Sequence, residues 1–75
     1  MNKSELSQKL RDKNVPKWWY HLDVIEYNDN FSLRQTETLW EVFFGERGIK
    51  YDLKTFDTEE DACEYLYGQL MEDMK

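Results

Sequence analysis

Residues 31–56 read FSLRQTETLWEVFFGERGIKYDLKTF, and this stretch decides the fold. Three runs within it alternate with a period of two. The positions that share one face are Phe31, Leu33 and Gln35, then Trp40, Val42 and Phe44, and finally Ile49, Tyr51 and Leu53. This period is typical of strands that are buried on one face only. The stretch therefore predicts three antiparallel strands joined by short connections.

The segment Gly45-Glu46-Arg47-Gly48 has the length and composition of a four-residue hairpin loop. Such a loop predicts a definite register between its two strands. In that register Phe44 lies opposite Ile49, Val42 opposite Tyr51, and Trp40 opposite Leu53. All six side chains then share one face of the sheet, which we expect to be its core side.

A short helix is expected before the strands, from about Ser4 to Asn14. Ser4 is a suitable N-cap, and Leu6 and Leu10 lie four positions apart on one helix face. Pro16 disfavours helical geometry in the residue before it, so the helix should end there.

An aromatic connector, Trp18-Trp19-Tyr20-His21-Leu22, follows this helix and leads into an extended segment through about Glu26. Asn28-Asp29-Asn30 then predicts a turn. The connector has two interpretations, a ligand-binding or base-stacking platform and a packed hinge, and packing is favoured because so small a domain needs the buried area.

The end of the chain has the strongest helix signal. Thr58 precedes three acids, Glu59, Glu60 and Asp61, in a variant of the capping box. A stripe with i+4 spacing follows, formed by Ala62, Leu66, Leu70 and Met74. That stripe is expected to face the core. Gly68 weakens the middle of this helix relative to alanine, and a close approach of the helix to the sheet is expected there.

These elements predict an α+β fold in a single domain covering residues 1–75. It consists of an N-terminal helix, a three- to four-stranded antiparallel β-meander, and a C-terminal helix packed on one sheet face. Aromatic residues make up 16% of the 75 residues, which favours a folded core over disorder.

The net charge of −6 is unevenly distributed. Residues 1–17 contain five bases and two acids, whereas residues 57–73 contain seven acids and no base. Direct nucleic acid binding is disfavoured by repulsion from phosphate, and a basic protein partner is favoured. No apolar run is long enough to span a membrane, and residues 1–13 do not resemble a secretory signal. A single cysteine points to a reducing compartment, so we expect a cytoplasmic protein.

The residues that carry chemistry form no recognisable catalytic or metal site. Cys63 lies on the predicted core stripe, where a buried small hydrophobe is expected. His21 has no acid nearer in sequence than Asp23, and one His and one Cys far apart cannot form a structural zinc site. No catalytic residue, metal or cofactor is predicted, and the chain is not expected to be an enzyme.

One predicted surface is a candidate for binding a partner. The sheet face opposite the core should display Phe43 beside Glu41 and Asp52, which the register makes cross-strand neighbours. An exposed aromatic ringed by acids is typical of the centre of a protein interface. The candidate partner-binding residues are Glu41, Phe43, Asp52 and, at the hairpin, Glu46. The alternative is that Phe43 is covered by the first helix or the aromatic connector.

The stretches WEVFFGERGIKYDLKTF (40–56) and TEEDAC (58–63) resemble small bacterial immunity proteins associated with polymorphic secreted toxins. The shared features are a strand ending in Glu-Arg-Gly, a strand ending in Phe, and a helix opening with Thr-Glu-Glu-x-Ala-Cys. The Tyr-x-Leu sequence at residues 20–22 also resembles a sequence in these proteins. The resemblance covers the C-terminal half and implies a protein that binds and occludes a toxin. It implies no catalytic residues and no particular toxin class.

The leading hypothesis is therefore a non-enzymatic protein-binding module, an immunity or antitoxin-like inhibitor that occludes a basic toxin domain. Two alternatives stay open. One is a small regulatory or structural accessory domain, such as a homodimer joined through the free sheet face. The other is an acidic mimic of nucleic acid, which would present a regular array of charges.

Overall fold

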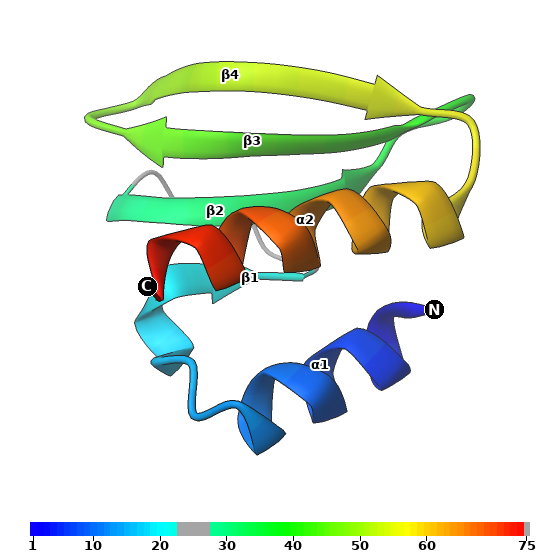
Figure 1. The fold of residues 1–75 in the computed structure, drawn as a ribbon. Coiled ribbons are helices and arrows are strands. Elements are labelled where there is room, and N and C mark those ends of the chain that lie inside the picture. Colours follow the sequence, from blue (N-terminus) through cyan, green and yellow to red (C-terminus); the bar gives the residue numbers. More distant parts are fainter. Residues whose placement is uncertain (23–27, 75) are drawn as a thin grey trace.

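The computed structural model describes residues 1–22 and 28–74 of the chain. One helix precedes and one follows a four-stranded sheet in the chain, and both lie on the same side of the sheet, so the predicted α+β class is confirmed (Figure 1). The elements are α1 (Lys3–Asp12), the 3-10 helix η1 (Lys17–Trp19), β1 (Tyr20–His21), β2 (Asn28–Gln35), β3 (Trp40–Glu46), β4 (Ile49–Phe56) and α2 (Glu59–Asp73). The packing of α2 against β2, β3 and β4 is also as predicted.

The sheet is mixed, not purely antiparallel as predicted. Its strand order is β1-β2-β3-β4, and β1 runs parallel to β2, with Tyr20 beside Phe31. The β2–β3 and β3–β4 pairs are antiparallel. A strand of two residues has no alternation, so its direction could not be predicted from the sequence.

The predicted turn at Asn28-Asp29-Asn30 is wrong, because these residues begin β2. Their pairing with β3 is irregular: Asn28 lies opposite Glu46 and Asn30 opposite Gly45. The expected extended segment through Glu26 falls mainly on residues 23–27, which lie outside the described residues.

The β3–β4 hairpin is tighter than predicted. Its turn consists of Arg47 and Gly48 alone, with φ of 52° and 79°. Positive φ at both central residues is the mark of a type I′ turn, whose twist matches that of the flanking strands. Glu46 therefore lies opposite Ile49, and Phe44 lies opposite Tyr51 instead of Ile49.

A β-bulge then changes the register further along the hairpin. Between the pairs Phe44–Tyr51 and Val42–Lys54, two residues of β4 oppose one residue of β3. Asp52 in the bulge has a φ of 53°. One extra residue moves every later side chain of β4 to the opposite face. The predicted pairs Val42–Tyr51 and Trp40–Leu53 are therefore wrong, and Trp40 lies opposite Phe56.

The core lies between the helices and the sheet. Its fully buried apolar residues come from α1, the segment after it, β2, β3 and α2. They are Leu6, Leu10, Val15, Leu33, Val42, Ala62, Cys63, Leu66 and Leu70. The predicted stripe of α2 is thus confirmed as far as Leu70, but Met74 is exposed beyond the end of the helix.

The boundaries of α1 are set by its two caps. Asn2, not Ser4, is the N-cap: its Oδ1 accepts from the Glu5 N–H at 2.9 Å, and the Glu5 Oε1 accepts from the Asn2 N–H at 3.1 Å. At the other end the Val15 N–H donates to the Leu10 carbonyl, and Asn14 has a φ of 59°. This is a Schellman motif, and it brings Val15 back into the core beside α1.

Replacing each of two glycines by alanine should change the free energy of unfolding in opposite directions. Gly48 has a positive φ that alanine tolerates poorly, so Gly48→Ala should lower the free energy of unfolding by about 1–2 kcal/mol. Gly68 lies inside α2, and a methyl group there meets no atom within 4 Å. Gly68→Ala should therefore raise stability by about 1 kcal/mol, and the predicted close approach of Gly68 to the sheet is wrong. Urea unfolding of both variants checks this, and a loss of stability in Gly68→Ala would contradict it.

Candidate protein-binding surface

Phe43 is buried by the chain itself and does not form an exposed anchor. Its side chain is 1% exposed, although it alternates with Val42 and so points away from the helical core. The Lys50 Nζ lies 4.8 Å from the centre of its ring. The expectation that Phe43 is exposed is therefore wrong, and its proposed role in anchoring a partner loses its basis.

Glu41 is held by a basic residue of the same chain. Its Oε1 lies 3.5 Å from the Lys50 Nζ, and the carboxylate is largely buried. The predicted contact between Glu41 and Asp52 is wrong, because the bulge places Glu41 opposite Thr55. Lys50 thus lies beside both Glu41 and Phe43 and partly offsets a charge that was expected to face a partner, although the Glu41 Oε1 accepts no hydrogen bond from the described residues.

The other two predicted residues lie along the β3–β4 hairpin. Asp52 is exposed in the bulge, and Glu46 is half-buried at the end of β3, opposite Ile49. The four predicted residues therefore do not form one bare surface. Their roles in binding stay predictions, with Asp52 the most accessible of the four.

The most apolar exposed element is the edge strand β4, which sequence reasoning had assigned to the core. Ile49, Tyr51 and Leu53 are 53%, 44% and 45% exposed. Among the described strands, β4 pairs with β3 alone, so its outer edge is open to a partner. The sequence did contain a signal for this exposure, namely the position of the strand. The last strand of a meander has one neighbour, and a face of that strand can extend past the covering helix.

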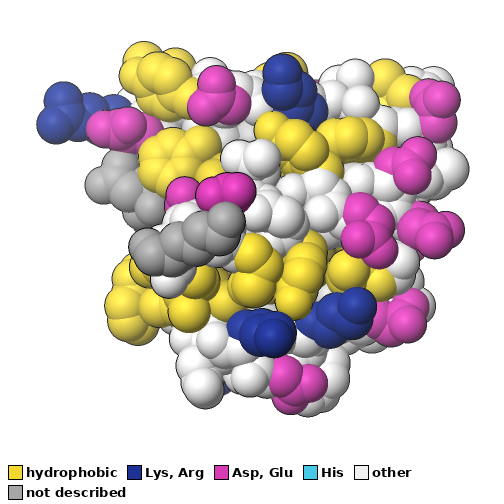
Figure 2. Space-filling view, viewed as in Figure 1, with side chains coloured by type: hydrophobic (Ala, Val, Ile, Leu, Met, Phe, Trp, Pro, Cys, Tyr) yellow, Lys and Arg dark blue, Asp and Glu magenta, His cyan; other side chains and the backbone are white. Residues whose placement is uncertain are grey.

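A second feature is the acidic face of α2. Figure 2 shows acidic side chains gathered at the right of the view, where the N-terminal half of this helix lies. Glu60, Asp61 and Glu64 are exposed there, and Glu72 and Asp73 are exposed at the other end of the helix. No basic residue of the helix balances them.

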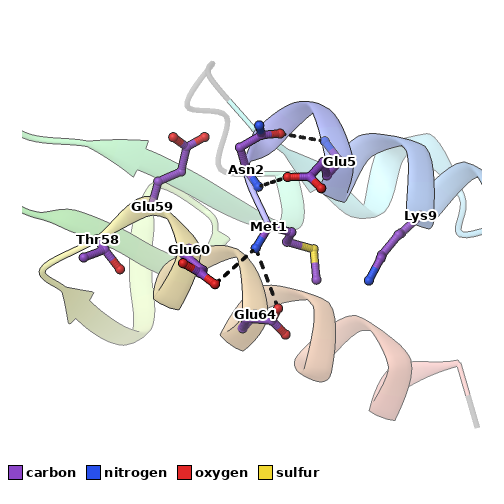
Figure 3. Close-up of a pocket in the computed structure, with 8 residues that line it drawn as sticks. All are labelled: Met1, Asn2, Glu5, Lys9, Thr58, Glu59, Glu60 and Glu64. Atoms are coloured by element: carbon purple, nitrogen blue, oxygen red, sulfur yellow. Dashed lines mark hydrogen bonds and ion pairs between the residues drawn. The ribbon is translucent and has the colours of Figure 1, made fainter.

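Part of this acidic face binds the start of the chain (Figure 3). The Met1 amino group lies 3.8 Å from the Glu64 Oε1 and 4.0 Å from the Glu60 Oε1, and the Lys3 N–H donates to the Glu59 Oε2 at 2.8 Å. The cleft around these contacts has a volume of about 670 Å³. Its lining residues are Met1, Asn2, Glu5, Lys9, Thr58, Glu59, Glu60 and Glu64. These contacts fasten α1 to α2.

The two residues considered as catalytic candidates, Cys63 and His21, lie in different parts of the fold. Cys63 is fully buried in the core, as predicted, whereas His21 is half-buried on the edge strand β1. Within residues 1–22 and 28–74, no three His, Cys, Asp or Glu side chains come close enough together to hold a metal ion.

Burial, reinforced by the nearby Glu59, raises the pKa of the Cys63 thiol from the ordinary 9.0 to about 11. As the pH rises from 9.0 to 11, the unfolded chain loses this proton while the folded chain keeps it. The free energy of unfolding should therefore fall over this window, by up to about 3 kcal/mol at about 1.4 kcal/mol per pKa unit. Urea unfolding at several pH values should show a steeper alkaline decline for the wild type than for Cys63→Ala. Parallel pH profiles would contradict this assignment.

Among the described residues, no helix is both long enough and apolar enough to cross a membrane. Comparisons with family models, with curated proteins and with solved structures found no match to this chain. The resemblance to immunity proteins is therefore supported only by the residues quoted for it.

Proposed function

We propose that this chain is a cytoplasmic, non-enzymatic module that binds and occludes a basic protein, in the manner of an immunity protein. The observation that carries the proposal is the exposed acidic face of α2, a helix that contains no base from Glu59 to Asp73. Such a surface accelerates encounter with a basic partner and disfavours acidic ones.

The exposed side chains of β4 complement this charge. Ile49 and Tyr51, on one face of β4, offer the apolar area that a stable interface needs at its centre, while α2 supplies a charged rim. Occlusion requires no group of this chain to react, since covering the active surface of the partner is sufficient. The immunity-like resemblance narrows the partner to a toxin domain, and it does not specify the toxin's activity.

The direct experiment uses the product of the neighbouring gene. Co-expression should yield a complex and should restore growth that this product inhibits alone. Failure of both binding and growth rescue would reject the proposed inhibitor role.

Charge changes then test how the partner is recognised. Neutralising α2 in a triple variant, Glu60→Gln, Asp61→Asn and Glu64→Gln, should weaken binding at least tenfold, or about 1.4 kcal/mol. Lys13→Gln with Lys17→Gln is the matched control, because it removes charge from the basic segment and should leave the affinity unchanged or improved. Equal losses in both variants, measured by calorimetry at low salt, would contradict recognition through α2.

A second candidate is the accessory homodimer, and the open β4 edge favours it. Two copies that pair β4 with β4 would cover the same exposed apolar residues. Light scattering after gel filtration separates the candidates: a dimer dissociated by Tyr51→Lys supports the second one, and a monomer leaves β4 free for another protein.

A further inference from the structure

A second recognition feature lies at the opposite end of α2 from the cleft around Met1. It is a cavity of about 310 Å³ lined by Trp19, Phe31, Phe44 and Asp73, which we name the aromatic corner. The four residues come from η1, β2, β3 and α2, so the complete fold is needed to assemble them. In Figure 2 hydrophobic side chains lie beside acidic ones at the left of the view, where α2 ends.

The two phenylalanines form the walls of this corner. Phe31 and Phe44 are cross-strand partners, with ring centres 5.2 Å apart and ring planes at 74°. In this edge-to-face arrangement the edge of one ring covers a face of the other, so a cation can reach only the ring faces left uncovered and not the space between the rings. Trp19 supplies a third ring, of the type that binds cations most strongly.

Two sources of negative charge act on the same space. Asp73 contributes a carboxylate, and the C-terminal end of α2 contributes the negative end of the helix dipole. A basic residue in the last turn normally offsets that dipole, but the last turn of α2 has none. A cation supplied by another molecule is therefore favoured at this position, and an anion is disfavoured.

A neighbouring cavity extends the corner along the sheet. It has a volume of about 320 Å³ and shares Phe31, Phe44 and Asp73 with the first. Asp52, Tyr65 and Lys54 also line it, which adds a second carboxylate, another ring and one basic side chain of the chain itself. Asp52, exposed by the bulge, thus lies on the path that a bound chain would follow out of the corner.

The chain already uses the same interaction elsewhere. Lysine Nζ atoms lie 4.8–5.7 Å from aromatic ring centres in three pairs, which are Lys3–Trp40, Lys9–Tyr67 and Lys50–Phe43. Within the described ranges, the rings of the aromatic corner have no such lysine or arginine. Among the described residues, no lysine or arginine lines the aromatic corner itself, so a cation from another molecule can enter it.

We propose that the aromatic corner receives a basic side chain, arginine above all, from the protein partner. A planar guanidinium stacks on aromatic faces and pairs with a carboxylate through two hydrogen bonds, and the corner offers both. The inference rests on the proposed function for the identity of the partner. The corner itself can be tested without that partner.

The test titrates the ¹⁵N-labelled full chain with the peptide acetyl-Ala-Arg-Ala-amide and follows it by NMR. Saturable shifts are expected at the Trp19 indole N–H and at the amides of Phe31, Phe44 and Asp73. The same peptide with citrulline, which keeps the shape of arginine but has no charge, should bind at least about fivefold more weakly. Equal binding of the two peptides, or no saturation, would overturn the proposal.

Two matched variants separate the corner from general electrostatics. Asp73→Asn and Glu37→Gln each remove one negative charge, and Glu37 is exposed between β2 and β3, outside the residues that line the corner. Asp73→Asn should weaken arginine-peptide binding at least about fivefold, whereas Glu37→Gln should leave it unchanged. Equal losses in both would show attraction to overall charge and would reject the site.

The outcomes also separate this inference from the proposed function. Peptide binding at the corner without any complex with the neighbouring gene product would keep the site and reject that partner. A complex whose affinity is unaffected by Asp73→Asn would keep the inhibitor role and reject the corner as its contact.

Discussion

Replacing Phe43 by alanine should lower the free energy of unfolding by about 3–5 kcal/mol, the usual cost of truncating a buried phenylalanine. The side chain is 1% exposed, and it also supports the Lys50 ammonium that binds Glu41. The loss approaches the whole stability expected of a domain of 75 residues, about 4–11 kcal/mol. Urea unfolding followed by circular dichroism measures it.

The control for Phe43 is Trp18, which is 72% exposed on η1. Trp18→Ala should change stability by less than about 0.5 kcal/mol. Phe43→Leu, which keeps most of the volume, should cost only about 1–2 kcal/mol and ensures that a folded variant can be measured. If Phe43→Ala did not lower stability, Phe43 would have to be exposed in solution. Its predicted role as an exposed anchor would then be supported again.

Replacing Leu10 by alanine should cost about 2–5 kcal/mol, because α1 is part of the core. Leu10 is fully buried, and its carbonyl accepts the Val15 N–H that closes the helix. The sequence left open whether the first helix docks at all. This variant answers the question in solution by thermal or urea unfolding.

The matched control for Leu10 is Leu53, which has the same side chain but is 45% exposed on β4. Leu53→Ala should change stability by less than about 0.5 kcal/mol in the monomer. Similar losses at both positions would mean that α1 contributes no more than a surface residue does, and the described packing would then be incorrect.

The parts of the fold predicted correctly depend on local chemistry. Thr58 was identified as the N-cap of α2 because its side chain satisfies a free N–H, and its Oγ1 does accept from the Asp61 N–H at 3.1 Å. The i+4 stripe through Leu66 and Leu70 faces the core for the same local reason. These signals require no knowledge of what lies across the sheet.

The errors arise where pairing decides the outcome. Nothing in the alternation of β4 reveals the extra residue at Asp52, yet this bulge reverses the faces of the residues that follow it. Phe43 was expected outside because it alternates with Val42. That argument assumes that the second sheet face is bare, and alternation alone cannot show what covers it.

The acidity of the candidate surface was predicted, but its position in the fold was not. The charge of residues 57–73 predicts an acidic surface, and α2 exposes most of those acids. The aromatic corner combines Trp19 with Asp73, which are 54 positions apart in sequence and come together only through the tertiary fold. Sequence reasoning noticed the aromatic connector around Trp19 but had no means of finding the carboxylate beside it.

The β-bulge at Asp52 also disfavours aggregation through the outer edge of β4. A long, regular outer strand would let molecule after molecule add on and grow into a fibre. The left-handed residue in the middle of β4 interrupts the row of outward-facing amide and carbonyl groups, so only short stretches match between copies. The bulge therefore disfavours extended stacking of copies along β4, the edge strand that exposes Ile49, Tyr51 and Leu53.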